Sequence, residues 1–310
     1  MVTPGPTNRV STKLYIPHPS DPTCSIAGVL EQLTSTAVTD SDAKATKRIA
    51  LILHGAGGHK DYLYQKRLAQ RLPLDSFRFD FRGNHETPGV WRQGGFAGDV
   101  VDLRAVVDYL SINYGYKVDL VVGHSRGSIV AFKWICTTEE GRNISAFVNA
   151  SGRYRMRKLL DAPGVNVWQE NILKQGYHLW TPIVARKQVS VQITGEDLDT
   201  FVNWDTSYVW DQFPSSIDVL TIHGLKDQLV SPYDGVIYAR ALNPRSPGTH
   251  NLHLMEDADH NFTGRQDEVV DTILEWWDKQ QERSITNGGD GNGQGSLKTG
   301  VWLSGIRGKL

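Results

Sequence analysis

The sequence predicts an α/β fold with a mostly parallel central sheet and helices on both of its faces. Short runs rich in Val, Ile and Leu alternate along the chain with segments whose apolar residues recur at helical spacing. The strand-like runs are continuously apolar and show no polar alternation. Continuous apolar strands are typical of parallel sheets, because helices cover both faces of such a sheet.

Length and charge narrow the class of protein. The chain has 310 residues, enough for one large core or for a core with a small second unit, and its formal net charge is −1. A chain so close to neutrality gives no reason to expect a nucleic-acid partner. No apolar run is long enough to span a membrane, and the N-terminus lacks the apolar stretch of a secretion signal. We therefore expect a cytoplasmic protein, and the oligomeric state stays open.

The expected elements follow one another in a regular order. Two early strands are expected at 11–17 and 25–33. After a polar connection, further strands are expected at 48–55, 75–83, 118–125, 144–151, 217–224 and 250–257. Apolar residues at helical spacing predict helices at 62–72, 96–114, 128–135, 232–242 and 267–281.

The alternation breaks between residues 152 and 216. This segment is rich in Trp, Tyr, Arg and Lys and holds no apolar strand of the earlier kind. We therefore expect a core made of residues 1–151 and 217–283, with residues 152–216 inserted as a helical lid. Residues 284–310 are rich in Gly and are expected to be a disordered tail.

A serine between two glycines lies where an expected strand meets an expected helix. The residues are Gly123, Ser125 and Gly127 of the motif Gly-His-Ser-Arg-Gly. When a strand turns sharply into a helix, the corner residue is strained, and small residues two positions away let the backbones pass. This context predicts that Ser125 is a nucleophile held above the sheet edge, with a helix N-terminus beneath it. A serine that only caps the helix is the alternative.

A base and an acid follow at suitable places. A nucleophilic serine needs a base, and the base needs an acid that orients it. Asp227 lies just beyond the strand expected at 217–224, and His260 lies just beyond the strand expected at 250–257. The order Ser125, Asp227, His260 is the one that this architecture requires. Each of the last two alone could equally be a turn aspartate or a surface histidine.

A glycine-rich segment follows the strand expected at 48–55. Residues 54–58 read His-Gly-Ala-Gly-Gly, and glycine permits a close approach of the backbone to a ligand. The backbone N–H groups of Ala56 and Arg126 could together hold the negative oxygen formed during acyl transfer. A glycine-rich turn without an electrostatic role is the alternative. The segment matches no phosphate-binding glycine pattern, so we expect no nucleotide.

Together these motifs resemble the α/β-hydrolase superfamily over residues 26–281. Residues 80–87 are similar to its D-x-R-G-x-G-x-S segment, with His85 in place of a usual glycine. A second departure is Ser128, where the family usually has a glycine after the nucleophile. The chain most resembles the serine-hydrolase branch with feruloyl-esterase-like, monoacylglycerol-lipase-like and serine-aminopeptidase-like proteins, and an uncharacterised fungal group within it.

The resemblance implies a serine hydrolase that cleaves a carboxylic ester through an acyl-enzyme intermediate. It assigns the nucleophile to Ser125, the acid to Asp227, the base to His260 and the oxyanion donors to Ala56 and Arg126. It implies no metal and no organic cofactor. An amide or peptide hydrolase, a thioesterase, an acyltransferase and a non-catalytic ligand-binding protein of the same fold remain open alternatives.

The substrate is expected to be selected by the insertion. We expect a small-molecule ester with a small-to-medium apolar or aromatic acyl group, because binding pockets favour apolar and aromatic walls. At least one of Trp204, Tyr208 and Trp210 is expected to line its site. Packing of these aromatic side chains onto the sheet is the alternative.

The side chain of Arg126 also needs a partner. We expect it to pair with a nearby acid, Asp99 or Asp102, and contact with a polar acyl group is the alternative.

Overall fold

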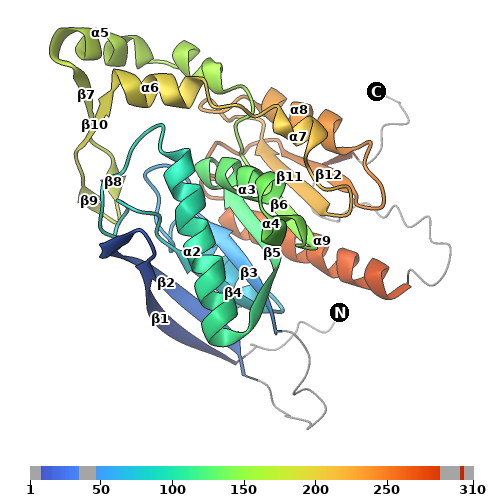
Figure 1. The fold of residues 1–310 in the computed structure, drawn as a ribbon. Helices are drawn as coiled ribbons and strands as arrows, with labels where there is room; N and C mark the ends of the chain where they lie inside the picture. Colours follow the sequence, from blue (N-terminus) through green and yellow to red (C-terminus); the bar gives the residue numbers. More distant parts are fainter. Residues whose placement is uncertain (1–7, 35–46, 287–300, 304–310) are drawn as a thin grey trace.

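The computed structural model describes residues 8–34, 47–286 and 301–303. Their central feature is one sheet with the strand order β1-β2-β4-β3-β5-β6-β11-β12-β13 (Figure 1). The strands are β1 (Arg9–His18), β2 (Asp21–Leu33), β3 (Lys47–Leu53), β4 (Asp75–Phe79), β5 (Tyr116–His124), β6 (Ala146–Ala150), β11 (Asp218–Gly224), β12 (His250–Met255) and β13 (Val301–Leu303). Six adjacent strands run parallel to one another: β4, β3, β5, β6, β11 and β12. Strands β1, β2 and β13 pair antiparallel with their neighbours. The predicted mostly parallel sheet is confirmed.

Helices cover both faces of the sheet. They are α1 (Gln65–Arg71), α2 (Phe96–Tyr114), α3 (Arg126–Thr137), α4 (Glu139–Arg142), α8 (Pro232–Leu242) and α9 (Gln266–Thr286). Because side chains alternate along a strand, Ile49, Leu51 and Leu53 of β3 join the core beneath α2, α3 and α8. Ala50 and Ile52 point the other way and join the core beneath α1 and α9. The sheet therefore separates two apolar layers, as the continuous apolar strands predict.

The insertion, residues 152–216, contains both helices and strands. Its elements are η2 (Met156–Asp161), α5 (Val165–Gln175), β7 (Tyr177–Trp180), β8 (Ile183–Val184), β9 (Lys187–Gln188), β10 (Val191–Thr194), α6 (Gly195–Val202) and α7 (Tyr208–Asp211). The expected helices are present, and the short strands are an addition that the sequence analysis did not predict. The four strands are two to four residues long and pair only as β7 with β10 and β8 with β9. Such short runs lack the long apolar stretch by which the central strands are recognised, and Figure 1 shows them outside the main sheet.

The C-terminal part also differs from the expectation. Helix α9 continues to Thr286, and β13 pairs antiparallel with residues 252–254 of β12. The unpaired edge of β12 offers backbone groups to which an extended segment can bond. The short strand thus corrects the prediction of a disordered tail at residues 301–303. The rest of that prediction, at 287–300 and 304–310, lies outside the described residues.

Two elements near the candidate site begin or end at other residues than the sequence predicts. Strand β4 ends at Phe79, earlier than the expected end at Gly83, because the chain turns there and Gly83 has a φ of 73°. Helix α3 begins at Arg126, directly behind the serine corner. Among the described residues no helix is both long and apolar enough to cross a membrane.

Candidate active site

Ser125 occupies the corner between β5 and α3. Its backbone has φ 51° and ψ −113°, a conformation that is strained for a residue with a side chain. Its amide donates a hydrogen bond to the carbonyl of Ala150, the last residue of β6, with an N···O distance of 2.8 Å. The predicted strained corner is therefore confirmed.

The flanking glycines are required by close backbone contacts. A Cβ atom at Gly123 would lie 2.7 Å from the backbone nitrogen of Ser128. A Cβ atom at Gly127 would lie 2.7 Å from the carbonyl oxygen of Leu53, at the end of β3. Both distances are below ordinary carbon contacts, so any side chain would push α3 away from the sheet. The glycines hold the start of the helix against the two strands and so set the position of Ser125.

Ser128 replaces the usual family glycine at a site that can accept it. Its side chain is fully buried, and its Oγ donates a hydrogen bond of 2.8 Å to the carbonyl of Gly123. Gly152 lies opposite, where a Cβ atom would be only 2.9 Å from the Cβ of Ser128. A glycine just after β6 thus makes room for the extra side chain.

The structure brings the three predicted catalytic residues together. Asp227 lies in the loop after β11, and His260 lies in the loop after β12. The His260 Nε2 atom is 2.9 Å from Ser125 Oγ, and its Nδ1 atom is 2.7 Å from Asp227 Oδ2. The three side chains form one hydrogen-bonded chain at the carboxyl end of the parallel strands. This is the geometry that a nucleophile, a base and an orienting acid require.

Asp227 stays ionised although it is buried. Burial alone would raise its pKa, but hydrogen bonds from His223 and His260 and from the amide of Val230 outweigh burial and hold the pKa well below its usual range. A carboxylate acts here as a fixed negative charge beside the imidazole. It favours the tautomer with hydrogen on Nδ1 and leaves Nε2 free to face Ser125.

The proposed oxyanion donors also lie beside Ser125. The loop after β3 is so close that a Cβ atom at Gly55 would be 3.1 Å from the Cβ of Ser125. Ala56 is exposed, and the first helical amide of Arg126 follows the serine directly. In the described part of the chain neither the Ala56 nor the Arg126 amide donates a hydrogen bond to a protein acceptor. Two unused N–H groups beside a nucleophile can receive a developing oxyanion.

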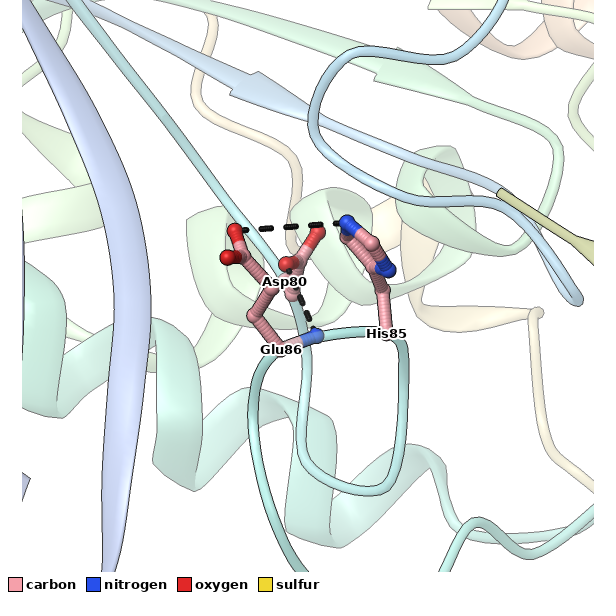
Figure 2. Close-up of side chains that lie close together, drawn as sticks. All are labelled: Asp80, His85 and Glu86. Atoms are coloured by element: carbon pink, nitrogen blue, oxygen red, sulfur yellow. Dashed lines mark hydrogen bonds and ion pairs between the residues drawn. The ribbon is translucent and has the colours of Figure 1, made fainter. Parts of the chain in front are cut away.

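The loop after β3 is anchored by a buried lysine. The Lys60 amide donates to Asp80 Oδ1, and its ammonium lies 2.7 Å from Asp80 Oδ2 and also binds Glu86. Figure 2 shows Asp80 and Glu86 with His85, a group that could offer three metal-ligand atoms within 4.8 Å of one another. The ammonium groups of Lys60 and Lys13 already bind these carboxylates. The two lysines therefore neutralise the Asp80 and Glu86 carboxylates, and the ion pairs of Lys60 hold the loop after β3 against the end of β4.

Three buried histidines were missed by the sequence analysis. His54, His124 and His223 each lie at or next to the end of a strand, directly before the glycine-rich loop, the serine and the acid loop. His124 Nε2 donates to the carbonyl of His260 at 3.0 Å, and Phe81 N–H donates to His54 Nε2 at 3.1 Å. Burial lowers the pKa of His54 to about 4 and of His124 to about 3, so both stay neutral. The repeated His-Gly and Gly-His pairs at strand ends were the available signal.

The three predicted substrate-contact residues make their described contacts with α2, α3 and the insertion. The Trp204 ring lies 5.0 Å from that of Phe96, and Tyr208 is buried beneath the ammonium of Lys133. Trp210 donates a hydrogen bond from Nε1 to the hydroxyl of Tyr154. Within the described residues, no hydrogen bond or ring contact joins these three to the Ser125 site. Their contact with substrate stays a prediction.

A different aromatic pair of the chain lies over the glycine-rich loop. The rings of Trp91 and Trp180 are 5.1 Å apart, and a Cβ atom at Gly57 would touch Trp180 at 2.9 Å. Both help to line a cavity of about 30 Å³, room for about one water molecule. Its lining residues are Gly57, Gly83, Asn84, His85, Trp91, Trp180, Pro182, Val184, Val189 and Val191. The insertion thus closes over the loop beside Ser125 with an apolar surface.

A parallel sheet whose strands end in a serine corner, an acid loop and a histidine loop defines a class of hydrolase folds. A model of the alpha/beta hydrolase family matches residues 50–272, and the chain belongs to this family. The uncharacterised protein YDL057W of Saccharomyces cerevisiae is 29% identical, with 77% of each chain covered. This similarity fits the resemblance to uncharacterised fungal proteins.

Solved esterases have the same fold. Est1E from Butyrivibrio proteoclasticus, solved with bound ferulic acid, has a TM-score of 0.67 at 16% identity, covering 87% of this chain and 99% of its own. Esterase Pf2001 from Pyrococcus furiosus has a TM-score of 0.60 at 18% identity, covering 90% and 94%. At such identities the similarity concerns the fold. Together with the family model, it supports a hydrolase activity.

Proposed function

We propose that this protein is a serine hydrolase that cleaves a carboxylic ester through an acyl-enzyme intermediate. The observation that carries the proposal is the position of His260, hydrogen-bonded to Ser125 Oγ on one side and to Asp227 Oδ2 on the other. A serine hydroxyl is a weak nucleophile until a neighbouring base takes its proton. The strained corner and the ionised Asp227 both serve that step.

The proposed reaction has two similar halves. His260 Nε2 takes the Ser125 proton as Oγ attacks the ester carbonyl, and the N–H groups of Ala56 and Arg126 hold the oxyanion. The carbonyl re-forms as the alcohol leaves with the proton from His260, so the acyl group remains on Oγ. Water then attacks the acyl group with His260 again as base, which releases the acid and restores Ser125. Asp227 stabilises the imidazolium in both halves.

We further propose that the acyl group is small to medium in size and apolar or aromatic. Trp91 and Trp180 provide aromatic walls beside Gly57, next to the proposed oxyanion donor Ala56. The present cavity is too small for an acyl chain, so the group would have to displace part of the Trp180 side chain. The ferulic acid bound to Est1E is an aromatic acid, which agrees with an aromatic acyl group for this chain.

A panel of p-nitrophenyl esters tests the reaction. Wild-type protein should hydrolyse the acetate, butyrate and benzoate esters, and Ser125→Ala should lose this activity. Ser111→Ala is a matched control, because Ser111 is an exposed residue of α2. Full turnover by Ser125→Ala would contradict the proposed nucleophile. Turnover of matched amides or thioesters alone would replace the ester with another acyl substrate.

Single alanine variants locate the acyl site. Trp180→Ala should raise kcat/KM for longer acyl chains relative to acetate, because it enlarges the space over Gly57. Trp204→Ala, Tyr208→Ala and Trp210→Ala test the prediction that one of these three lines the site. A change in chain-length preference for one of them but not for Trp180→Ala would move the pocket to that part of the insertion.

A further inference from the structure

The proposed catalytic acid contacts a second buried histidine. His223 lies near the end of β11, and its side chain is fully buried. Its Nε2 atom is 3.0 Å from the carbonyl oxygen of Val230 and 3.2 Å from Asp227 Oδ2. Asp227 Oδ2 therefore faces two imidazole nitrogens, His260 Nδ1 and His223 Nε2.

These contacts fix the tautomer of His223. Both atoms near Nε2 are oxygens that only accept hydrogen bonds, so Nε2 carries the hydrogen. Nδ1 is buried, has no hydrogen-bond partner among the described residues and lies 3.4 Å from where a Cβ of Gly235 in α8 would be. The ring is thus held between α8 and the acid loop, and its single N–H is shared between the Val230 carbonyl and Asp227 Oδ2.

Hydrogen bonds to both oxygens also fix the orientation of the Asp227 carboxylate. Asp227 Oδ1 accepts hydrogen bonds from the amides of Leu229 at 2.9 Å and Val230 at 2.8 Å. Oδ2 accepts from His260 and lies within reach of the His223 N–H. With donors on both oxygens, the carboxylate cannot rotate without losing a bond, so Oδ2 stays aimed at His260 Nδ1.

We propose that His223 is a positioning residue for the Asp227–His260 pair, an inference that rests on the proposed serine-hydrolase function. It holds Asp227 Oδ2 toward His260, and it shares the negative charge of that oxygen. A carboxylate oxygen that accepts from two donors stabilises the His260 imidazolium less than one that accepts from His260 alone. His223 therefore extends activity to lower pH.

The other charged groups around the carboxylate do not replace this N–H. The charge of Arg153 interacts with that of Asp227, but its Nη2 donates to the carbonyl of Leu229, which fixes the loop. His124 binds the carbonyl of His260 and is kept neutral by burial. Of the groups that the structure describes around Asp227, only His260 and His223 bind its carboxylate from a side chain.

Three variants test the proposal through a pH profile. His223→Leu removes the N–H, His223→Gln keeps an N–H donor of similar reach, and His253→Leu is the matched control. His253 is fully buried on the neighbouring strand β12, and in the described part of the chain its ring nitrogens have no hydrogen-bond partner. If His223→Leu does not fold, His223→Met replaces it as a donor-free variant.

We expect His223→Leu to lower kcat/KM by about ten- to a hundredfold, the range that follows loss of an outer partner at metal sites. Its acidic limb should move to higher pH by about half a unit or more, because Asp227 Oδ2 then accepts from His260 alone. His223→Gln should recover most of the rate and of the profile. The inference is overturned if His223→Leu has the rate and the acidic limb of His253→Leu.

Failure of the proposed function gives a different result. If wild-type protein hydrolyses none of the esters, the Nδ1–H resonance of His260 in proton NMR still tests the positioning role. That resonance should shift or broaden in His223→Leu and stay unchanged in His253→Leu. An unchanged resonance in both variants overturns the inference whatever the reaction.

Discussion

Arg126 and Asp99 form a buried ion pair directly behind the nucleophile, with Arg126 Nε 2.6 Å from Asp99 Oδ2. The same guanidinium donates to the carbonyls of Arg92 and Gln93 and lies over the ring of Phe96. The expectation that Arg126 pairs with Asp99 or Asp102 is thus confirmed for Asp99. One side chain ties the serine corner to the segment before α2.

Arg126→Met should destabilise the protein in a pH-dependent way. It leaves Asp99 as a buried carboxylate without a cation, which costs roughly 3–5 kcal/mol of unfolding free energy when the acid is ionised. Burial raises the pKa of Asp99 to about 6 even beside Arg126. Protonation of Asp99 therefore removes the unpaired charge in mild acid. The loss of unfolding free energy in Arg126→Met should be smaller at pH 5.5 than at pH 7.5. Urea unfolding at both pH values checks this, and an equal loss at both would contradict it.

Asp227→Asn should lower kcat by about 10⁴-fold, because an amide favours the wrong tautomer of His260. The matched control is Asp257→Asn, an exposed acid in the β12 loop that pairs with Lys226 and should keep the wild-type rate. Steady-state kinetics on one ester measure both. Near-full activity of Asp227→Asn would place the acid elsewhere, with Asp257 and Asp259 as the next candidates.

Gly123→Ala should strongly destabilise the fold, because its Cβ would lie 2.7 Å from the backbone of Ser128. Gly98→Ala is the matched control. A Cβ at Gly98, inside α2, meets no atom within 4 Å, so this change should stabilise the helix by about 1 kcal/mol. In thermal unfolding, the melting temperature should fall for Gly123→Ala and rise for Gly98→Ala if the corner is as tightly packed as the structure indicates. Equal melting temperatures would show that α3 can move away from β5.

The free energy of unfolding should fall as the pH is lowered below about 6.5, because buried His54 and His124 must stay neutral in the folded protein. Burial lowers the pKa of His54 to about 4 and that of His124 to about 3. In the unfolded chain both bind protons near pH 6.5, so acid favours unfolding down to the folded values. Each such histidine contributes about 1.4 kcal/mol per pH unit. His124→Gln should reduce the slope, measured by urea unfolding between pH 7 and 5, and an unchanged slope would contradict the assignment.

The sequence predicts the core well because its central strands are long and apolar. Residues 49–53 and 120–122 are continuously apolar and cannot be exposed without large cost, so their burial follows directly from the sequence. The strands of the insertion are different. A run such as Ile183–Val184 is too short to show any period, and its pairing with Lys187–Gln188 depends on a turn whose backbone the sequence does not reveal.

The candidate site is predictable to the extent that it follows strand ends. Ser125, Asp227 and His260 are each placed by a central strand, and the structure brings their side chains into one hydrogen-bonded chain. The sequence analysis assigned no role to His223, because a buried histidine near the end of a strand is usually a packing residue. Its contact with Asp227, four residues later, depends on the backbone turn after β11, where the Asp227 amide donates to the Gly224 carbonyl, and residue types alone do not reveal that geometry.

Labelling with a fluorophosphonate probe tests the central claim most directly, because the probe reacts preferentially with an activated serine. Intact-protein mass spectrometry should show one adduct per wild-type chain, and peptide mapping should place it on Ser125. Ser125→Ala and His260→Ala should remain unlabelled while folded. An adduct on another residue, a labelled Ser125→Ala, or a folded wild-type protein that takes up no probe would contradict the account.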